Sequence, residues 1–322
     1  MADSIISASG LTKRFGPSAG VFDLDLEIAP GLIVGLIGPS GSGKTTTVRL
    51  MTGILSADSG QLSVLGADPE SFTSATRQQI GYMPQDSNLD PHLTLHENLN
   101  FAASLYGMSY QRSRQLDRII DFVELQNVVH RLPGEASGGE RRRLMLASTL
   151  IHQPELIFLD EPTAGIDPVL RKRIWDRLRE LGEQGRSLMV TTQYVGEAAY
   201  CDYVVVLAHG RRLIADTPEG LRSAAYGGEL IDITFEQSLP ASDVASLEET
   251  ITTQPMRWID SRSVRLVVDD AGAAAPEVAK WAEQRGVSLE KVEAFLPPYD
   301  DVFVHLVDRF DHDEDRGAEL LG

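Results

Sequence analysis

Glycines gather in the segment 38–45, which reads GPSGSGKT. Because glycine has no side chain, the backbone N–H groups around it can converge on an anion such as phosphate. The apolar run at 33–38 predicts a buried strand before the segment, and a helix is predicted from Lys44 to about Met51. The N-terminus of that helix adds its dipole. A strand, a glycine-rich turn and a helix in this order indicate a phosphate-binding loop.

Two side chains of the loop add further chemistry. Lys44 can reach the β- and γ-phosphates of a nucleotide, and the Thr45 hydroxyl is a suitable ligand for Mg²⁺. A plain glycine turn is the alternative, but it requires neither the strand before the loop nor the helix after it. We therefore expect ATP and Mg²⁺ as cofactors. The predicted nucleotide contacts in the loop are Gly38, Pro39, Ser40, Gly41, Ser42, Gly43, Lys44, Thr45 and Thr46.

Two consecutive carboxylates end a second apolar run, LIFLDEP at 156–162. Asp160 is expected at the carboxyl edge of the sheet, where it can hold Mg²⁺ through water. Glu161 follows, and its predicted role is general base for the attacking water. An acid after an apolar run is common by itself. Together with the phosphate loop it indicates a nucleotide-hydrolysing site, with Lys44 and Glu161 among the catalytic residues.

The elements that must position these residues alternate over the first 220 residues. Strands are predicted at 33–38, 156–160, 187–192 and 203–210, and a helix at 168–183. Buried strands alternating with helices predict a parallel α/β sheet. Residues 94–130 look helical and poor in strands, which indicates an all-helical insert.

A second, smaller domain is predicted after residue 224. Its order of elements, β-α-β-β-α-β, matches a ferredoxin-like unit. An amphipathic helix is expected at 299–310, and docking on a second subunit would bury its apolar face. The acidic segment 311–322 is expected to be disordered. The expected elements are a strand at 229–237, a helix at 241–251, a hairpin around Ser261 and Arg262, a helix at 275–286 and a strand at 287–295. The residues expected to face inward on the last helix are Val302, Phe303, Leu306 and Phe310.

Composition excludes several classes of protein. The net charge is −18, and most of the acidic excess falls after residue 220, which argues against charge-driven binding to nucleic acid or to an anionic membrane. The longest apolar stretch, at 32–38, is far shorter than the roughly 20 residues that a membrane-spanning helix needs. The N-terminus lacks the apolar core of a secretion signal, and the single cysteine, Cys201, cannot form an internal disulfide. A cytoplasmic location is expected.

The region around the second motif narrows the family. ASGGERRRLMLASTLIHQPELIFLDEPTAGIDP at 136–168 resembles the signature region of ATP-binding cassette (ABC) ATPases, and the resemblance runs in order over 5–220. It implies a P-loop NTPase cassette of the α/β class, in which a RecA-like mixed sheet carries an α-helical subdomain at about 88–153. The expected domains are the cassette at 1–224, an accessory α+β domain at 225–310 and the tail at 311–322.

The resemblance also implies roles for residues outside the loop. Phe15 lies where the family stacks an aromatic ring on adenine. Gln85 matches the glutamine that senses Mg²⁺ and faces the coupling helix of the transporter. Two subunits of the family join head to tail around two ATP molecules, so a homodimer is implied in the ATP-bound state. The residues expected to contact nucleotide or the opposite subunit there are Ser137, Gly138, Gly139, Glu140 and Asp167. The implied metal ligands are Thr45, Gln85 and Asp160.

Two positions depart from the common pattern. The signature ends in Glu140 instead of glutamine, and Gln193 stands where a histidine usually orients the γ-phosphate and the base. Losing a hydrogen bond to a charged group costs roughly 1.5–3 kcal/mol, so an impaired ATPase would be about 10–100-fold slower. We favour the other interpretation, with Gln193 as a working catalytic residue. TTQY at 191–194 and LPPYDDVFVHL at 296–306 resemble the subgroup of daunorubicin-resistance ATPases, in which this glutamine is usual.

Arginines at 141–143 form a charge run directly after the signature. Such a run is typical of a solvated helix face. The alternative is a contact with ATP or with the partner subunit. The sequence leaves both open.

The resemblance implies the ATP-hydrolysing subunit of an exporter, peripheral on the inner face of the cell membrane. It would drive a hydrophobic drug, antibiotic or lipid through a separate integral-membrane permease by ATP-driven dimer closure. ABC ATPases of translation or DNA repair usually join two cassettes or carry a basic or coiled-coil insert, and importer ATPases usually carry a small all-β extension. The acidic single cassette with a β-α-β-β-α-β extension fits neither alternative well, and no nucleic-acid partner is expected.

Overall fold

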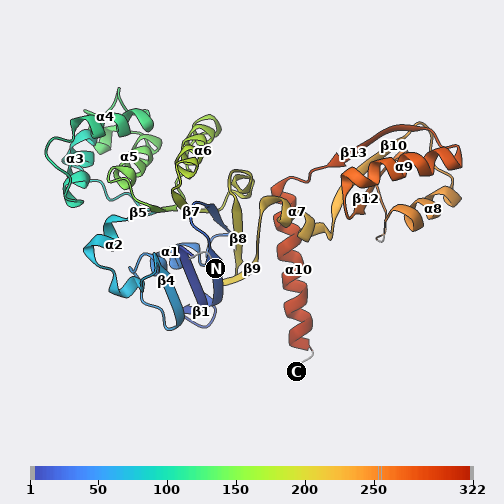
Figure 1. Ribbon diagram of the computed structural model, residues 1–322, viewed down its shortest axis with the longest axis horizontal. Coiled ribbons are helices and arrows are strands. Elements are labelled where there is room, and N and C mark those ends of the chain that lie inside the picture. Colours follow the sequence, from blue (N-terminus) through green and yellow to red (C-terminus); the bar gives the residue numbers. More distant parts are fainter. Residues whose placement is uncertain (1–3, 253, 255, 320–322) are drawn as a thin grey trace. The chain divides into compact units, whose positions relative to one another are not determined.

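The chain folds into two compact units, the first ending at Ala215 and the second beginning at Asp216 (Figure 1). The structure is a computed structural model and describes residues 4–252, 254 and 256–319. The division falls earlier than the expected domain end at 224. Helix α7 (Pro218–Tyr226) packs against α10 (Tyr299–Glu319) and so belongs with the second unit.

A six-stranded sheet forms the centre of the first unit, in the order β5-β6-β7-β3-β8-β9. β3 pairs in parallel with β7 and β8, and β6 pairs in parallel with β5 and β7. Every residue of β3, β6 and β7 is buried, which agrees with the apolar runs in these strands. The predicted parallel sheet is confirmed. The strands are β3 (Ile33–Ile37), β5 (Ile80–Met83), β6 (Leu156–Asp160), β7 (Ser187–Thr192), β8 (Tyr203–Ala208) and β9 (Arg211–Asp216).

A second sheet in the first unit has the order β2-β1-β4 and is antiparallel. Its strands, which were not predicted from the sequence, are β1 (Ile6–Arg14), β2 (Gly20–Ile28) and β4 (Ser59–Val64). One hydrophobic core joins this sheet to the central sheet and to helix α1 (Lys44–Met51), and it includes Leu24, Val48 and Phe158. This core fixes α1, and with it the loop at 38–43, against both sheets.

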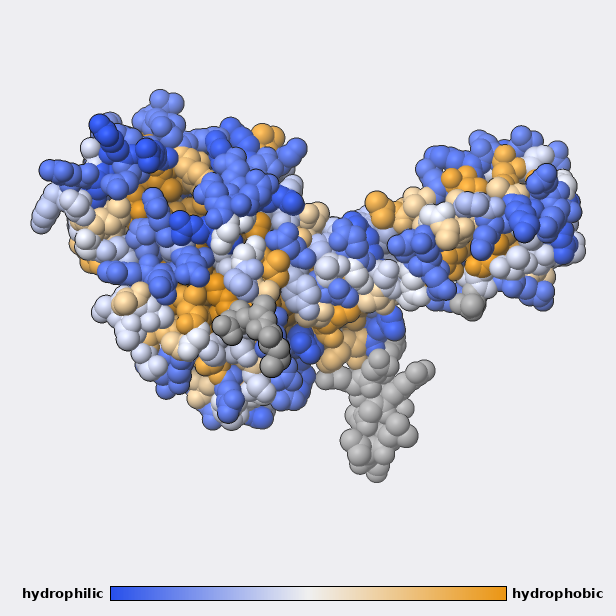
Figure 2. Space-filling view, viewed as in Figure 1, coloured by the Kyte–Doolittle hydropathy of each residue, from blue (hydrophilic) through white to orange (hydrophobic). Residues whose placement is uncertain are grey.

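The predicted helical insert lies between β5 and β6. It contains α3 (Leu95–Leu105), α4 (Ser113–Phe122) and α5 (Gly138–Leu150). The surface of the first unit seen in Figure 2 is largely hydrophilic, with apolar areas among the polar ones. Three large apolar side chains of the insert are more than half exposed, at 54, 70 and 98% of their surface: Phe101, Leu105 and Tyr110. The remaining helical segments of this unit are α2 (Ser74–Gln78), α6 (Pro168–Glu183) and 3-10 turns at Pro69–Ser71, Pro133–Glu135 and Val195–Tyr200.

The second unit contains a four-stranded sheet in the order β11-β12-β10-β13, in which each neighbouring pair is antiparallel. With one helix after β10 and one after β12, this is the predicted ferredoxin-like arrangement. The helices α8 and α9 share a core with the sheet, where Trp281 packs edge to face on Phe235. The elements are β10 (Glu229–Phe235), α8 (Ala241–Ile251), β11 (Arg257–Trp258), β12 (Ser263–Val268), α9 (Ala271–Arg285) and β13 (Leu289–Phe295).

Helix α10 is longer than predicted. It continues to Glu319, so the disorder expected from residue 311 is not found as far as 319, and 320–322 lie outside the described residues. No proline interrupts the acidic segment, and extending a formed helix adds one hydrogen bond per residue. Part of its apolar face is covered within the same chain, because Val302 and Leu306 are buried and Arg309 donates to the Ala224 carbonyl at 2.7 Å. The expected docking on a second subunit stays a prediction.

Phe303 and Phe310, the other two residues expected to face inward on α10, are half-buried. The start of the helix is also held by α7, since the guanidinium of Arg222 lies 3.9 Å from the ring centre of Tyr299.

Within the described part of the chain, no helix combines the length and the apolar character that crossing a bilayer requires.

Candidate functional site

The glycine-rich loop connects the end of β3 to the start of α1, as predicted. Gly41 and Gly43 have φ angles of 81° and 100°, in the left-handed region that favours glycine. A side chain at Gly38 would also be excluded, because its Cβ would lie 2.2 Å from the carbonyl oxygen of Leu207. Backbone N–H groups can approach a phosphate closely in such a loop.

Lys44 is buried and turns back across the loop. Its Nζ donates to the carbonyl oxygens of Gly38 and Pro39 at 2.8 and 2.9 Å. Burial lowers the pKa of Lys44 from its ordinary value, while the nearby carboxylates of Glu161 and Asp160 act in the opposite direction. The ammonium group therefore lies at the loop with two weak acceptors, which phosphate oxygens can replace by stronger, charged ones.

Asp160 ends β6 and is fully buried. Its Oδ1 accepts hydrogen bonds from the hydroxyls of Thr45 at 3.2 Å and Thr191 at 2.5 Å. Its Oδ2 is buried and has no hydrogen-bond partner among the described residues, and the same holds for Oγ of Ser42 in the loop. Buried polar atoms normally have a partner. An unpartnered carboxylate oxygen next to a threonine hydroxyl suits a hard cation such as Mg²⁺, so the residues present fit this metal.

Glu161 has a φ of 51°, an uncommon backbone conformation for a residue other than glycine. Its N–H donates to the carbonyl oxygen of Thr191 at 3.1 Å and to the Thr191 hydroxyl at 3.0 Å. Its Oε2 accepts a hydrogen bond from Nε2 of Gln85 at 3.2 Å. The structure thus brings Gln85, Thr45, Asp160 and Glu161 together beside Lys44, as the sequence predicted.

The signature residues lie at the start of α5 and bond to their own helix. Ser137 Oγ accepts from the N–H of Glu140 at 3.2 Å, and Glu140 Oε2 accepts from the N–H of Ser137 at 2.7 Å, which is a capping box. This hydrogen bond from Ser137 is the main cause of the lowered pKa of Glu140. Asp167 caps α6 in a similar way, accepting from the N–H groups of Val169 and Leu170. Both positions are helix N-termini, where an anion is favoured.

Four residues with predicted contacts are exposed or half exposed in the single chain. Phe15 is 59% exposed, and Gln193, just after β7, is exposed as well. Gly138 and Gly139 lie in the first turn of α5, where Gly138 is exposed and Gly139 half-buried. The structure contains one chain, so their expected contacts with nucleotide and with a second subunit stay predictions.

The arginines at 141–143 do not form a solvated helix face, so that interpretation of the charge run is wrong. All three guanidinium groups donate to backbone carbonyl oxygens, and all three residues are half-buried. Arg142 donates to the carbonyls of Gln85, Asp160 and Glu161.

Thr191, whose hydroxyl donates to Asp160, was not predicted from the sequence as a site residue. A threonine at the end of a predicted strand next to β6 was the available signal.

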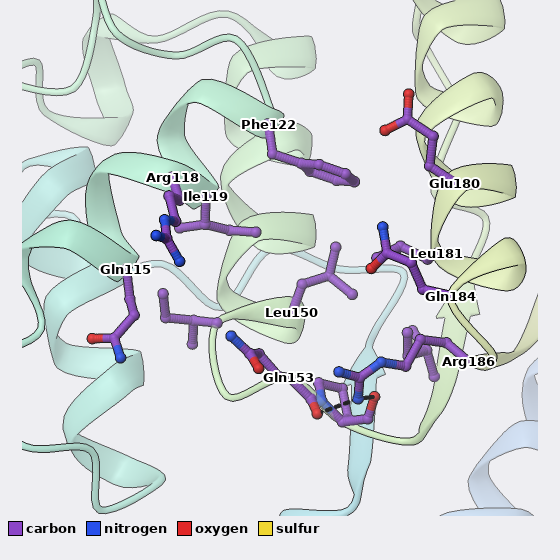
Figure 3. A pocket seen from close by; sticks show the side chains of 13 residues that line it. Gln115, Arg118, Ile119, Phe122, Leu150, Gln153, Glu180, Leu181, Gln184 and Arg186 are labelled. Carbon is purple, nitrogen blue, oxygen red and sulfur yellow. Dashed lines mark hydrogen bonds between the residues drawn. The ribbon is translucent and has the colours of Figure 1, made fainter.

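A cavity of about 320 Å³ lies elsewhere in the first unit, between α4, the end of α5 and the end of α6 (Figure 3). Apolar side chains such as Phe122 and Leu150 line it together with polar ones. Arg186 donates across it to the carbonyls of Gln153 and Pro154, 2.5 Å away in each case. No predicted site residue lines this cavity. It lies where β6 begins, whereas the carboxylates lie where β6 ends.

Comparisons with known proteins agree with the geometry. The family model described as "ABC transporter" matches residues 21–164. The chain is similar to the daunorubicin resistance ATP-binding protein DrrA3 of Streptomyces coeruleorubidus, with 34% identity over 312 residues that cover 95% of this chain and 96% of DrrA3. It is also 36% identical over 237 residues to the probable multidrug ABC transporter ATP-binding protein YbhF of Escherichia coli K12.

That match covers 73% of this chain and 41% of YbhF, so the chain spans less than half of the length of this relative. Among solved structures, an ATP-binding subunit of an ABC transporter has a TM-score of 0.63 and 26% identity, and the match covers 70% of this chain and 94% of that one. With its loop, paired carboxylates and signature helix in place, and with DrrA3 matched over almost its whole length, the chain belongs to the ABC transporter ATPases.

Proposed function

We propose that the chain is the ATP-hydrolysing subunit of an ABC exporter. One observation supports this more than any other. The Thr45 hydroxyl, the carboxylates of Asp160 and Glu161, and the Gln85 amide form adjoining hydrogen-bonded pairs beside the Lys44 ammonium group. This arrangement provides a phosphate cradle, oxygen ligands for Mg²⁺ and a carboxylate base within one site, which is the chemistry of phosphoryl transfer to water.

Each residue of the site has its own role in hydrolysis. Lys44 and the loop N–H groups bind the terminal phosphates of ATP. Glu161 accepts the proton of the attacking water as the water oxygen bonds to the γ-phosphorus and the bond to the β–γ bridging oxygen breaks, giving ADP and phosphate. Thr45 and Asp160 would hold Mg²⁺, which neutralises phosphate charge when bound. Gln85 orients the Glu161 carboxylate through its hydrogen bond at 3.2 Å.

Gln193 would hold the γ-phosphate through its amide. We expect Gln193→Ala to lower kcat about 10–100-fold, because a hydrogen bond to a charged group contributes roughly 1.5–3 kcal/mol. Gln193→His restores a donor and should stay within about threefold of the parent rate, since proton transfer by this residue is not required. Steady-state phosphate release measures both. A large loss with histidine as well would show that the amide itself has another role.

A second copy of the chain would complete each site. The start of α5 presents the backbone N–H groups of Gly138 and Gly139, which can donate to a γ-phosphate bound by another subunit. Two-fold symmetry makes both interfaces identical, so two ATP molecules would be trapped and hydrolysis would release the dimer. Phe15, 59% exposed, is free to stack on adenine.

An integral-membrane permease is the proposed partner, on the inner face of the cell membrane. Phe101 and Leu105 lie one turn apart on α3, exposed at 54 and 70% of their surface, and Tyr110 in the same helical insert is 98% exposed. Such a patch suits a protein partner. The names of DrrA3 and YbhF refer to daunorubicin resistance and multidrug transport. They support a hydrophobic drug or antibiotic as cargo, with lipid as the alternative.

Affinity purification tests the partnership. Tagged Glu161→Gln protein, isolated from detergent-solubilised membranes with ATP and Mg²⁺, should bring an integral-membrane protein in near-equal amount. The variant Leu105→Asp, made in the same background, should recover much less of it, because a charge on the apolar patch must be desolvated on docking. Recovery of ribosomes or DNA-repair proteins without a membrane partner would contradict transport and leave the ATPase chemistry intact.

A further inference from the structure

The three arginines of α5 bond to different parts of the first unit. Arg141 and Arg143 donate to carbonyls within the helical insert, Arg143 to those of Val123 and Glu124 at 2.8 and 2.7 Å. Arg142 alone reaches out of the insert to the ends of β5 and β6. One guanidinium group therefore connects the signature helix to two segments of the hydrolytic site.

The carbonyls that Arg142 selects belong to the residues that form that site. Its Nη1 donates to the carbonyl of Gln85 at 3.1 Å, and its Nη2 donates to the carbonyls of Asp160, at 3.3 Å, and Glu161. A hydrogen bond to a carbonyl fixes the plane of that peptide and so the direction in which the neighbouring side chains leave the backbone. The planar fork of arginine can hold several acceptors at once, which the ammonium group of lysine does less well.

Glu161 needs this support more than most residues. Its φ of 51° lies in a sparsely populated region, which persists only where the surroundings hold it. Thr191 holds the N–H side of the residue, and Arg142 holds its carbonyl side. The Glu161 side chain then meets the amide of Gln85, whose own carbonyl is bound by the same arginine. Both members of the Glu161–Gln85 pair are thus oriented from α5.

Electrostatics agrees with this geometry. Burial lowers the pKa of Arg142 from its ordinary value, and the carboxylates of Glu161 and Asp160 act in the opposite direction. Arginine keeps its charge even when partly buried. A permanent cation in this place compensates part of the negative charge of the two carboxylates before nucleotide arrives.

We propose that Arg142 is a positioning residue for hydrolysis, which holds the peptide of Glu161 and the Gln85 segment in register with the signature helix. It rests on the proposed role of Glu161 as base. Because α5 begins at the signature loop, any displacement of that helix moves the peptide that carries the base. Arg142 thereby links the position of the signature loop to the orientation of the base in the same chain.

The test compares two arginines of one helix. Arg142→Gln is expected to lower the rate of single-turnover ATP hydrolysis about 30-fold, with the Kd for ATP changed less than about threefold. Arg143→Gln is the matched control, since Arg143 is also half-buried and also donates to backbone carbonyls, two of them against the three of Arg142. The melting temperature of this variant should fall, while its rate of single-turnover hydrolysis stays within about threefold of the parent. Equal rate losses in both variants, or an unchanged rate in Arg142→Gln, would overturn the proposal.

Two further variants separate a positioning role from a merely structural one. Arg142→Lys keeps the charge but cannot bond all three carbonyls at once, so a loss of about 5–10-fold is expected, and a parental rate would overturn the proposal even if Arg142→Gln failed to fold. In the Glu161→Gln background, Arg142→Gln should lower the residual rate by less than about threefold, because its effect acts through Glu161. A full 30-fold loss there would overturn the proposal.

The proposed function is checked separately by Glu161→Gln alone. A parental rate in that variant would remove the base assignment, whatever Arg142 does. An inactive Glu161→Gln together with a fully active Arg142→Gln would leave the base in place and remove only the positioning role.

Discussion

Replacing Glu161 by glutamine is expected to lower kcat for ATP hydrolysis about a thousandfold, while ATP still binds. Glutamine has the same shape and can keep the contact with Gln85, but it cannot accept the proton of the attacking water at neutral pH. The backbone should be unaffected, because its N–H stays bonded to Thr191. Phosphate release measures kcat, and equilibrium titration with a fluorescent ATP analogue measures binding.

The same variant should accumulate as a nucleotide-bound dimer, since hydrolysis would no longer open it. Light scattering with ATP and Mg²⁺ should report twice the mass of the chain, and without nucleotide a single one. Glu155→Gln is the control, because this exposed glutamate precedes the same strand, β6, at its opposite end. Hydrolysis by Glu161→Gln within about tenfold of the parent would refute the assignment of Glu161 as base.

Replacing Lys44 by alanine should raise the Kd for ATP at least about 100-fold, which is the second large effect. Each charge-assisted hydrogen bond to phosphate contributes roughly 1.5–3 kcal/mol, and the lysine can make more than one. Its loss would also remove one of the two cations near Asp160 and Glu161, so these carboxylates would repel the phosphates more strongly. The binding titration should show no saturation at concentrations that saturate the parent.

Lys172→Ala is the control for this substitution, because Lys172 lies exposed on α6. It should bind ATP like the parent. A melting temperature of Lys44→Ala close to that of the parent, measured without nucleotide, would show that the lost affinity does not come from unfolding. Saturable binding by Lys44→Ala with an affinity near the parental one would contradict the role of the lysine.

The parts of the fold that sequence predicted best are those with a simple physical signature. Strands buried on both faces are largely apolar, as β3 is throughout and β6 is up to its last residue, Asp160. The phosphate loop needs glycines at positions with positive φ, and Gly41 and Gly43 occupy two of them. The two carboxylates could be predicted because they stand where the apolar strand β6 ends, at the edge of the sheet next to the loop. In each case a short stretch of sequence is enough for the prediction.

The sheet β2-β1-β4 was missed for an equally physical reason. The pairing of β1 with β2 shifts register between Ala8 and Leu11 and again between Leu11 and Lys13. Such irregularities break the alternation of apolar and polar residues on which a strand prediction depends. For the acidic end of α10 the error was the reverse, because disorder was predicted where the structure has a helix. A run of charges suggests disorder, but it does not prevent a helix from continuing.

The role of Arg142 could not be predicted from the sequence at all. A run of three arginines has the same pattern whether the side chains reach water or a distant carbonyl. Which carbonyls lie within reach depends on how α5 packs against β5 and β6, and these segments lie far from Arg142 in the sequence. Long-range geometry decides such contacts, and no local propensity encodes it.

Nucleotide binding should also support folding, because the loop at 38–45 and Asp160 come together only in the folded chain. A ligand that binds the native state and not the unfolded chain stabilises the native state. By mass action, a ligand at 100 times its Kd stabilises the native state by about 2.7 kcal/mol. In a cell rich in ATP the loaded form is therefore the long-lived one. When energy supply falls, the empty chain unfolds more often and becomes the preferred substrate of proteases, so the amount of this motor in the cell would follow the fuel that it consumes.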